Sequence, residues 1–344
     1  MMARPSNRKT KLRSASRTTM RDVALVAGKV HPSTVSLALR NSPRVSAKIR
    51  TKIQAIAAKI GYRRDPLLDA FNQHRLKIVP QRASRHIAVI SDFSSLAELN
   101  ASLPHAAARV GAMDAAARLH CRIDFFFCGP GQPDSRRLDA VLEARGLRAL
   151  LLLGVRGEAD EMEFSWARQC AVAIDSLQLL IPLYRVTPDY RESTRLLWRN
   201  AWTQGSQRIA ILRSNAAQPL TEDRAIAGFL LEQMRHPQTT PIPVFTFTHE
   251  RGCPALFKTW LRAHRPQVIL HPALVTKAML QLLSGESIRC FAFDAHRPTD
   301  PGIYPDYTEV GRRAVEHLVT LMQTNQLGPP PAAVCTYVAV KLPV

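Results

Sequence analysis

Apolar residues recur with two different spacings in this chain, and the spacing changes near residue 86. Between residues 19 and 64 they lie three and four positions apart, which predicts three short helices. From residue 86 onward, apolar runs of about five residues alternate with helical patterns, which predicts β-strands separated by helices. The pattern therefore divides the chain into a helical head and an α/β body.

The first predicted helix begins at Thr19, whose hydroxyl can cap the helix, and ends at Gly28. Asp22, three residues after Thr19, adds the negative charge that a helix start favours. The predicted apolar face of this helix consists of Val23, Ala24 and Ala27.

The second predicted helix opens at His31-Pro32. Proline suits the first helical position, because the N–H group that it lacks would have no hydrogen-bond partner there. Its inward positions are Val35, Ala38 and Leu39, and its outward positions are Pro32, Ser33, Ser36 and Leu37.

A third predicted helix is capped by Ser46 and ends at Gly61. Its expected buried stripe is Ile49, Ile53, Ile56 and Ile60. Two short helices joined by a tight turn and backed by a third predict a helix-turn-helix domain that reads duplex DNA.

The charge distribution supports a DNA partner. Residues 1–85 hold 20 Lys or Arg against 3 Asp or Glu, whereas the remaining 259 residues hold 27 against 24. A near-neutral body with a strongly basic head is typical of proteins that bind the phosphate backbone. Residues 1–18 are expected to be a disordered basic arm, either lying along phosphates or making no specific contact.

Several stretches of the head resemble the LacI/GalR family, which is the lac repressor and purine repressor family. They are Arg21-Asp22-Val23-Ala24, Ser33-Thr34-Val35-Ser36, Asn41, Val45-Ser46 and Gly61-Tyr62. Their spacing follows that family along residues 19–64, apart from one extra residue in the turn near Lys29.

The resemblance implies a transcription regulator, with a repressor favoured over an activator. Pro32, Ser33 and Leu37 match the family's base-reading positions. The expected contacts to the DNA backbone come from the amide end of the third helix and from Thr34, Ser36, Arg40, Arg44 and Ser46. Thr19 and Arg21 are further expected DNA-binding residues.

A hinge and linker are expected over residues 65–85. Asp65-Pro66 can start a short helix, and counting from Tyr62 places Phe71 where relatives wedge an apolar side chain into the minor groove. Asp69 and the long stretch 72–85 depart from the family pattern, so a plain packing role for Phe71 stays open.

Residues 86–344 are expected to form two doubly wound α/β lobes, because there are too many strands for one sheet. The expected strands span 86–91, 122–127, 149–154, 171–175, 208–213, 243–248, 267–271, 289–294 and 335–340. This half resembles the family's effector domain, which has the fold of periplasmic sugar-binding proteins and also implies dimerisation.

The resemblance also places an effector at the strand ends that face the cleft between the lobes. The candidates that follow strands are Asp92, Arg156, Arg213, His271 and Asp294. Arg224 stands before Gly228 much as an effector-contacting arginine does in relatives, but one residue further away. Each of these side chains can equally be a strand-end cap or an ion-pair partner. A sugar, a nucleobase-like metabolite and no effector at all stay open.

The function expected from the sequence is a sequence-specific regulator that binds a near-palindromic operator as a homodimer. The alternative is an architectural DNA-binding protein with a ligand-free regulatory domain. An enzyme is disfavoured because the sequence has no glycine-rich phosphate loop, nucleophile elbow or metal motif, and no cofactor is expected. The cysteine spacing fits no metal site, and the basic head and missing signal peptide argue against a transport protein. With no apolar run long enough to span a membrane, a cytoplasmic protein is expected.

Overall fold

The computed structural model divides into two compact units, residues 1–78 and 79–344. It describes residues 19–28, 30–39, 42, 45–60, 62, 86–155, 162–174, 181–215, 219–248, 253–275, 277–284 and 287–343. The basic arm, the hinge with Phe71, and the side chains of Arg40, Arg44 and Arg156 lie outside the described residues. No helix of the described part is long and apolar enough to cross a membrane.

The head consists of α1 (Met20–Val26), α2 (Pro32–Leu39) and α3 (Ala47–Lys59). Thr19 and Asp22 form a reciprocal capping box at the start of α1, which confirms the expected helix start. The predicted inward residues Val23, Val35 and Ala38 are fully buried and share one core with Ile53 of α3. Gly28 follows α1 with a φ of 104°, a conformation that glycine adopts without strain.

Two details predicted for α3 are wrong. Ser46 stands at the N-cap position, but its side chain makes no capping hydrogen bond. Ile49 is 44% exposed, because residues 46–49 all lie at the surface and nothing in the described head covers the first turn of α3. The buried face of α3 is centred instead on Ile53 and Ala57, one and two turns further along.

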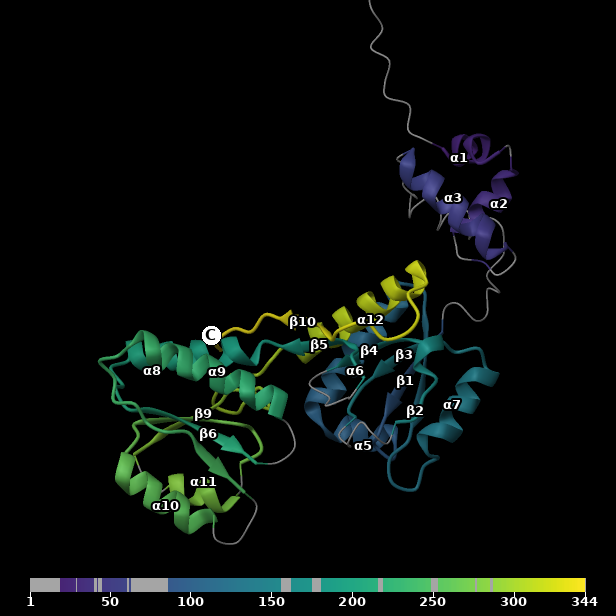
Figure 1. Cartoon of the computed structure of the whole chain (residues 1–344). Helices are drawn as coiled ribbons and strands as arrows, with labels where there is room; N and C mark the ends of the chain where they lie inside the picture. Colours follow the sequence, from purple (N-terminus) through teal and green to yellow (C-terminus); the bar gives the residue numbers. More distant parts are fainter. Residues whose placement is uncertain are drawn as a thin grey trace, which may run out of the picture. The chain divides into compact units, whose positions relative to one another are not determined.

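The first lobe of the body is built on a six-stranded parallel sheet with the strand order β10-β5-β4-β3-β1-β2. Its strands are β1 (His86–Ser91), β2 (Arg122–Phe127), β3 (Ala149–Leu152), β4 (Cys170–Ile174), β5 (Tyr184–Pro188) and β10 (Val334–Val338). Helices α6 (Leu103–Arg118) and α12 (Tyr307–Thr324) cover one face, and α7 (Ser135–Ala144) covers the other (Figure 1). The short helix α5 (Leu96–Ala101) precedes α6.

The second lobe is built on a four-stranded parallel sheet with the order β7-β6-β8-β9. Its strands are β6 (Ile209–Ser214), β7 (Phe245–Phe247), β8 (Val268–His271) and β9 (Arg289–Ala292). Helices α8 (Tyr190–Thr203) and α9 (Pro219–Arg235) pack on one face, and α10 (Cys253–His264) and α11 (Lys277–Ser284) on the other (Figure 1). Two doubly wound sheets confirm the predicted architecture. All nine predicted strands are present within a few residues of their expected bounds, and β5 is the strand that the sequence reading missed.

The chain passes between the lobes more than once, so neither lobe is a continuous segment. After β9, α12 returns to the core of the first lobe, and β10 completes that lobe's sheet. Beyond β10, Val340 packs into the core of the second lobe. The return of α12 depends on two glycines. A Cβ on Gly111 would lie 1.8 Å from the carbonyl oxygen of Thr308, and one on Gly311 would lie 1.8 Å from that of Ala108.

We expect Gly311→Ala to lower the free energy of unfolding of the body by about 1–3 kcal/mol, because the added methyl group must displace the backbone of α6. The higher helix propensity of alanine offsets only about 0.5–1 kcal/mol of this loss. Urea unfolding measures the change, with Gln323→Ala at an exposed position of α12 as control. Equal or higher stability of Gly311→Ala would show that α6 and α12 can separate without loss.

Candidate DNA-binding surface and effector residues

The exposed side of α2 carries a short row of hydroxyl and apolar side chains. Ser33 is exposed, and Pro32, Thr34, Ser36 and Leu37 are half-buried. His31, just before the helix, acts as its cap, because its Nδ1 lies 3.3 Å from the backbone N–H of Ser33 and 2.7 Å from the Ser33 hydroxyl. The sequence reading took His31-Pro32 as the helix start without assigning this cap. The contact fixes the orientation of the Ser33 hydroxyl at the helix end.

A tight core holds α2 in place. Val35 and Ala38 have no exposed surface, and the side-chain amide of Gln54 on α3 donates to the carbonyl oxygen of Ala38 at 3.1 Å. Because α2 and α3 are tied by both packing and a hydrogen bond, the outward side chains of α2 project from a rigid support.

Positive charge dominates the surface around α2. The head between residues 19 and 62 contains eight Lys or Arg and a single acid, Asp22. The Asp22 carboxylate accepts hydrogen bonds from the backbone N–H and the hydroxyl of Thr19, both at 2.7 Å, and these bonds lower the pKa of Asp22. Arg21, Lys48, Lys52 and Lys59 are exposed. The one acid is thus engaged in capping α1, and the four cations named here face solvent, as binding to phosphates requires.

Three of the predicted effector residues lie at the carboxyl edge of the second sheet. Arg213 lies at the end of β6 and pairs with Asp223 at 3.0 Å. His271 ends β8, and its Nδ1 donates to the carbonyl oxygen of Pro272 at 2.8 Å. Burial lowers the pKa of His271, which favours the neutral ring. The Asp294 carboxylate, just after β9, accepts from the backbone N–H of Ala273 at 2.7 Å. Each group therefore has a local partner as well as a position at the sheet edge.

The other effector candidates lie elsewhere. Asp92 is half-buried just after β1 in the first lobe. Arg224 lies on α9 rather than at a strand end, and its guanidinium carbon is 4.5 Å from the ring centroid of Tyr337 on β10. Arg224 therefore contacts the first lobe from a helix of the second.

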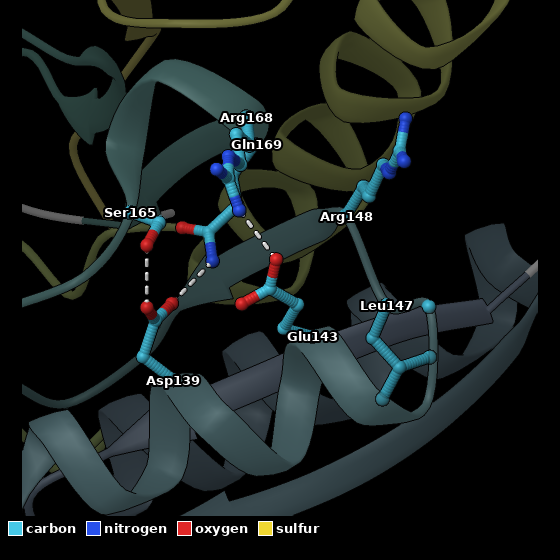
Figure 2. A pocket seen from close by; sticks show the side chains of 8 residues that line it. Asp139, Glu143, Leu147, Arg148, Ser165, Arg168 and Gln169 are labelled. Carbon is cyan, nitrogen blue, oxygen red and sulfur yellow. Dashed lines mark hydrogen bonds and ion pairs between the residues drawn. The ribbon is translucent and has the colours of Figure 1, made fainter.

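Two surface hollows lie in the first lobe, and none of these residues lines either of them. Figure 2 shows the smaller one, of about 70 Å³, where Asp139 accepts hydrogen bonds from Ser165 at 2.7 Å and from Gln169 at 2.8 Å, and Glu143 pairs with Arg168. This hollow has room for a few water molecules and none for a sugar. The other, of about 330 Å³, is an open groove between β2 and α7.

A family model described as bacterial regulatory proteins, lacI family, matches residues 19–65. These residues belong to the lacI family. A comparison of the sequence with curated proteins gave no match.

Similar solved structures extend the likeness to the lacI-family fold over nearly the whole chain. The transcriptional regulator CelR in complex with cellobiose is 18% identical with a TM-score of 0.56, over 95% of this chain and 99% of that chain. The lac repressor dimer bound to operator and the anti-inducer ONPF is 18% identical with a TM-score of 0.51, over 94% and 97%. A LacI transcriptional regulator from a Rhodococcus species is 19% identical with a TM-score of 0.56, over 74% and 95%. The body behind the lacI-family head therefore has the fold of these regulators.

Two buried glutamates of α9 were not predicted from the sequence. Glu232 has no exposed surface and binds Arg195 of α8 at 2.8 Å, Arg199 at 2.9 Å and Arg235 at 3.3 Å. The sequence does contain a signal for this cluster. Arg195 and Arg199 lie four residues apart on α8, and Arg235 follows Glu232 by three residues on α9, so that each pair lies on one helix face. Glu222 is also buried, and its carboxylate accepts from the backbone N–H of Ser214 at 2.6 Å. Burial raises the pKa of Glu222 to about 7 against the opposing effect of that hydrogen bond.

We expect Glu222→Gln to stabilise the body at pH 8 but to change little near pH 4. Between the ordinary pKa of a glutamate and about 7, folded Glu222 keeps a proton that the unfolded chain releases, so stability falls as pH rises through this range. The glutamine keeps the acceptor for Ser214 and carries no charge, so the cost, on the order of 1–3 kcal/mol, disappears. Urea unfolding at the two pH values measures the difference, and the same effect at both would contradict the raised pKa.

Proposed function

We propose that this protein is a sequence-specific transcription regulator that binds a near-palindromic operator as a homodimer and responds to a small molecule held by its two-lobed body. One observation carries the proposal. A rigid lacI-family head presents the hydroxyl-bearing side of α2 together with the exposed cations Arg21, Lys48, Lys52 and Lys59. An α-helix of this kind fits the major groove, and flanking cations neutralise phosphates. The two similar structures that cover nearly the whole chain are regulators, and we assign no catalytic step to the chain.

Within this proposal, Ser33 and the apolar Pro32 and Leu37 read base edges. Ser33 can hydrogen bond to a base, while the other two contact apolar groups such as a thymine methyl. Thr19, Arg21, Thr34, Ser36 and Ser46 contact the DNA backbone, together with Arg40 and Arg44. The exposed first turn of α3 supports this assignment, because its free backbone N–H groups and Lys48 form a favourable site for a phosphate. Phe71 is proposed as the minor-groove wedge.

The small molecule is proposed from the fold and from the relatives. CelR binds cellobiose, and the lac repressor structure contains operator and an anti-inducer. In this chain, Arg213, His271 and Asp294 lie at one sheet edge, and with Asp92, Arg156 and Arg224 they are the proposed effector residues. One head covers only a few base pairs, which favours a dimer on a two-fold site.

The test is selection of bound sites from a random duplex pool by the full-length protein at near-physiological salt. Recovery of a near-palindromic motif supports a specific dimeric regulator. Binding without any motif, with or without a mixture of sugars and nucleobases, would favour the alternative of an architectural DNA-binding protein.

On the selected operator, Ser33→Ala should alter base preference at one position of each half-site, with a loss of about 1–3 kcal/mol of discrimination there. Non-specific DNA should be bound as before, because the hydroxyl contributes no charge. Competition binding with single-base operator variants measures this, and a uniform loss over all sequences would assign Ser33 to the backbone instead.

Lys48→Ala should weaken binding to every sequence and reduce the slope of log affinity against log salt by about 1. Lys59→Ala is the matched control, because Lys59 is an exposed lysine of the same helix about 16 Å away at its other end. Titrations over a salt series give both slopes. Equal slopes for the two variants would remove the first turn of α3 from the proposed interface.

A further inference from the structure

Arg185 on β5 is a half-buried cation that forms no ion pair with another described residue. Its Nε atom is buried and has no hydrogen-bond partner, and no ion pair among the described residues includes its guanidinium. Burial lowers the pKa of Arg185; the neighbouring Cys335 and Tyr337 side chains oppose this effect, and the positive charge of Arg224 adds to it. An unpaired guanidinium in such a place costs free energy of folding, so its presence needs a reason.

The groups around Arg185 come from three elements and both lobes. Its direct neighbour on the adjacent strand is Cys335, which stands opposite it in the β5–β10 register. Tyr337, two residues further along β10, lies on the same face of the sheet as Cys335. Arg224 of α9 covers the Tyr337 ring at 4.5 Å. The cluster therefore combines two guanidinium groups, a phenol and a thiol.

Two acids adjoin Arg224 and β5 in the sequence, and both pair with other groups. Asp223, next to Arg224, pairs with Arg213 at 3.0 Å. Asp189, just after β5, lies 3.9 Å from Arg191 and caps α8 by accepting from the backbone N–H of Glu192 at 3.2 Å. Two neighbouring cations are thus left with no carboxylate of this chain to balance them, in the described part of the structure.

The buried charge of Glu232, in contrast, is paired with side chains of opposite charge. There, the buried charge is surrounded by three arginines within 3.3 Å. At Arg185 and Arg224 the cations are present, and the described residues supply no carboxylate to pair with them.

We propose that Arg185, Arg224 and Tyr337 form a binding site for an anionic group, a phosphate or a carboxylate, carried by the effector. This site rests on the proposed function, because it assumes that the protein has an effector. It narrows the effector from any sugar or metabolite to one that carries a negative charge. Two guanidinium groups provide planar donors that match the oxygens of either anion. The Tyr337 hydroxyl hydrogen bonds with the Cys335 side chain, and it would have to turn from that partner to donate to the anion.

The test follows thermal unfolding of the full-length protein with and without an anion. The probes are inorganic phosphate, glucose 6-phosphate and gluconate, each against sodium chloride at equal ionic strength and against glucose. A ligand that binds the folded state raises Tm, and at a fixed ligand concentration the rise grows with the logarithm of the affinity. The variant is Arg185→Met, which keeps the apolar stem and removes the charge, and the control is Arg262→Met at an exposed position of α10.

The expected result is a rise in Tm with at least one anion, which Arg262→Met retains and Arg185→Met loses, corresponding to at least about tenfold weaker binding. Without anion, Arg185→Met should unfold at the same temperature as the wild type or higher, because an unpaired buried charge has been removed. Phosphate compounds and gluconate separate the two kinds of anion.

The proposal is overturned if no anion raises the Tm of the wild type, if Arg185→Met responds as the wild type does, or if it is destabilised without anion as a structural cation would be. The experiment contains no DNA. Loss of the operator motif in the selection experiment would therefore overturn the proposed function separately, and a missing anion response with an intact motif would overturn this site alone.

Discussion

The body depends on the close approach of α6 and α12. The backbones of these helices meet at Gly111 and Gly311 with no space for a Cβ on either side. This contact allows α12, which follows the second lobe in sequence, to pack against the core of the first lobe and leads into β10. Since β10 in turn continues to Val340 in the second core, both lobes are parts of one folding unit and share their connecting segments.

The arginines of the body fall into two groups with different roles. Arg195, Arg199 and Arg235 surround the buried Glu232, and the two arginines of α8, Arg195 and Arg199, tie α8 to α9. Thr194 of α8 also donates to the carbonyl oxygen of Ala225 at 2.7 Å. Each of these three arginines has a carboxylate partner within the protein and a structural role. Arg185 and Arg224 have no carboxylate partner among the described residues, and Arg224 contacts an aromatic ring instead. For the proposed anion site, the lack of a carboxylate partner in the described structure is what sets Arg185 and Arg224 apart from the arginines around Glu232.

The sequence predicted most of the fold because its signals are local. The Thr19–Asp22 capping box and the buried Val23, Val35 and Ala38 follow from spacing within one or two helical turns. Strand β5 was missed because Arg185, Thr187 and Pro188 interrupt its apolar pattern, and only pairing with β4 and β10 makes it a strand. The exposure of Ile49 could not be predicted either, because helical spacing does not say where the neighbouring helix ends. The balance of charge at Arg185 and Glu232 depends on α8, α9 and β10, which are brought together only by the fold.

The position of the unbalanced arginines has a consequence for coupling between the lobes. Arg185 belongs to the sheet of the first lobe and Arg224 to a helix of the second, so a ligand held by both must contact both lobes. Its affinity then depends on how the two lobes are placed, and by linkage the ligand shifts that placement by the same free energy. A ligand bound at the sheet edge of Arg213, His271 and Asp294 alone would contact one lobe and exert no such bias. An anion site shared by the lobes therefore supplies the differential contact that a regulator needs to respond to its effector.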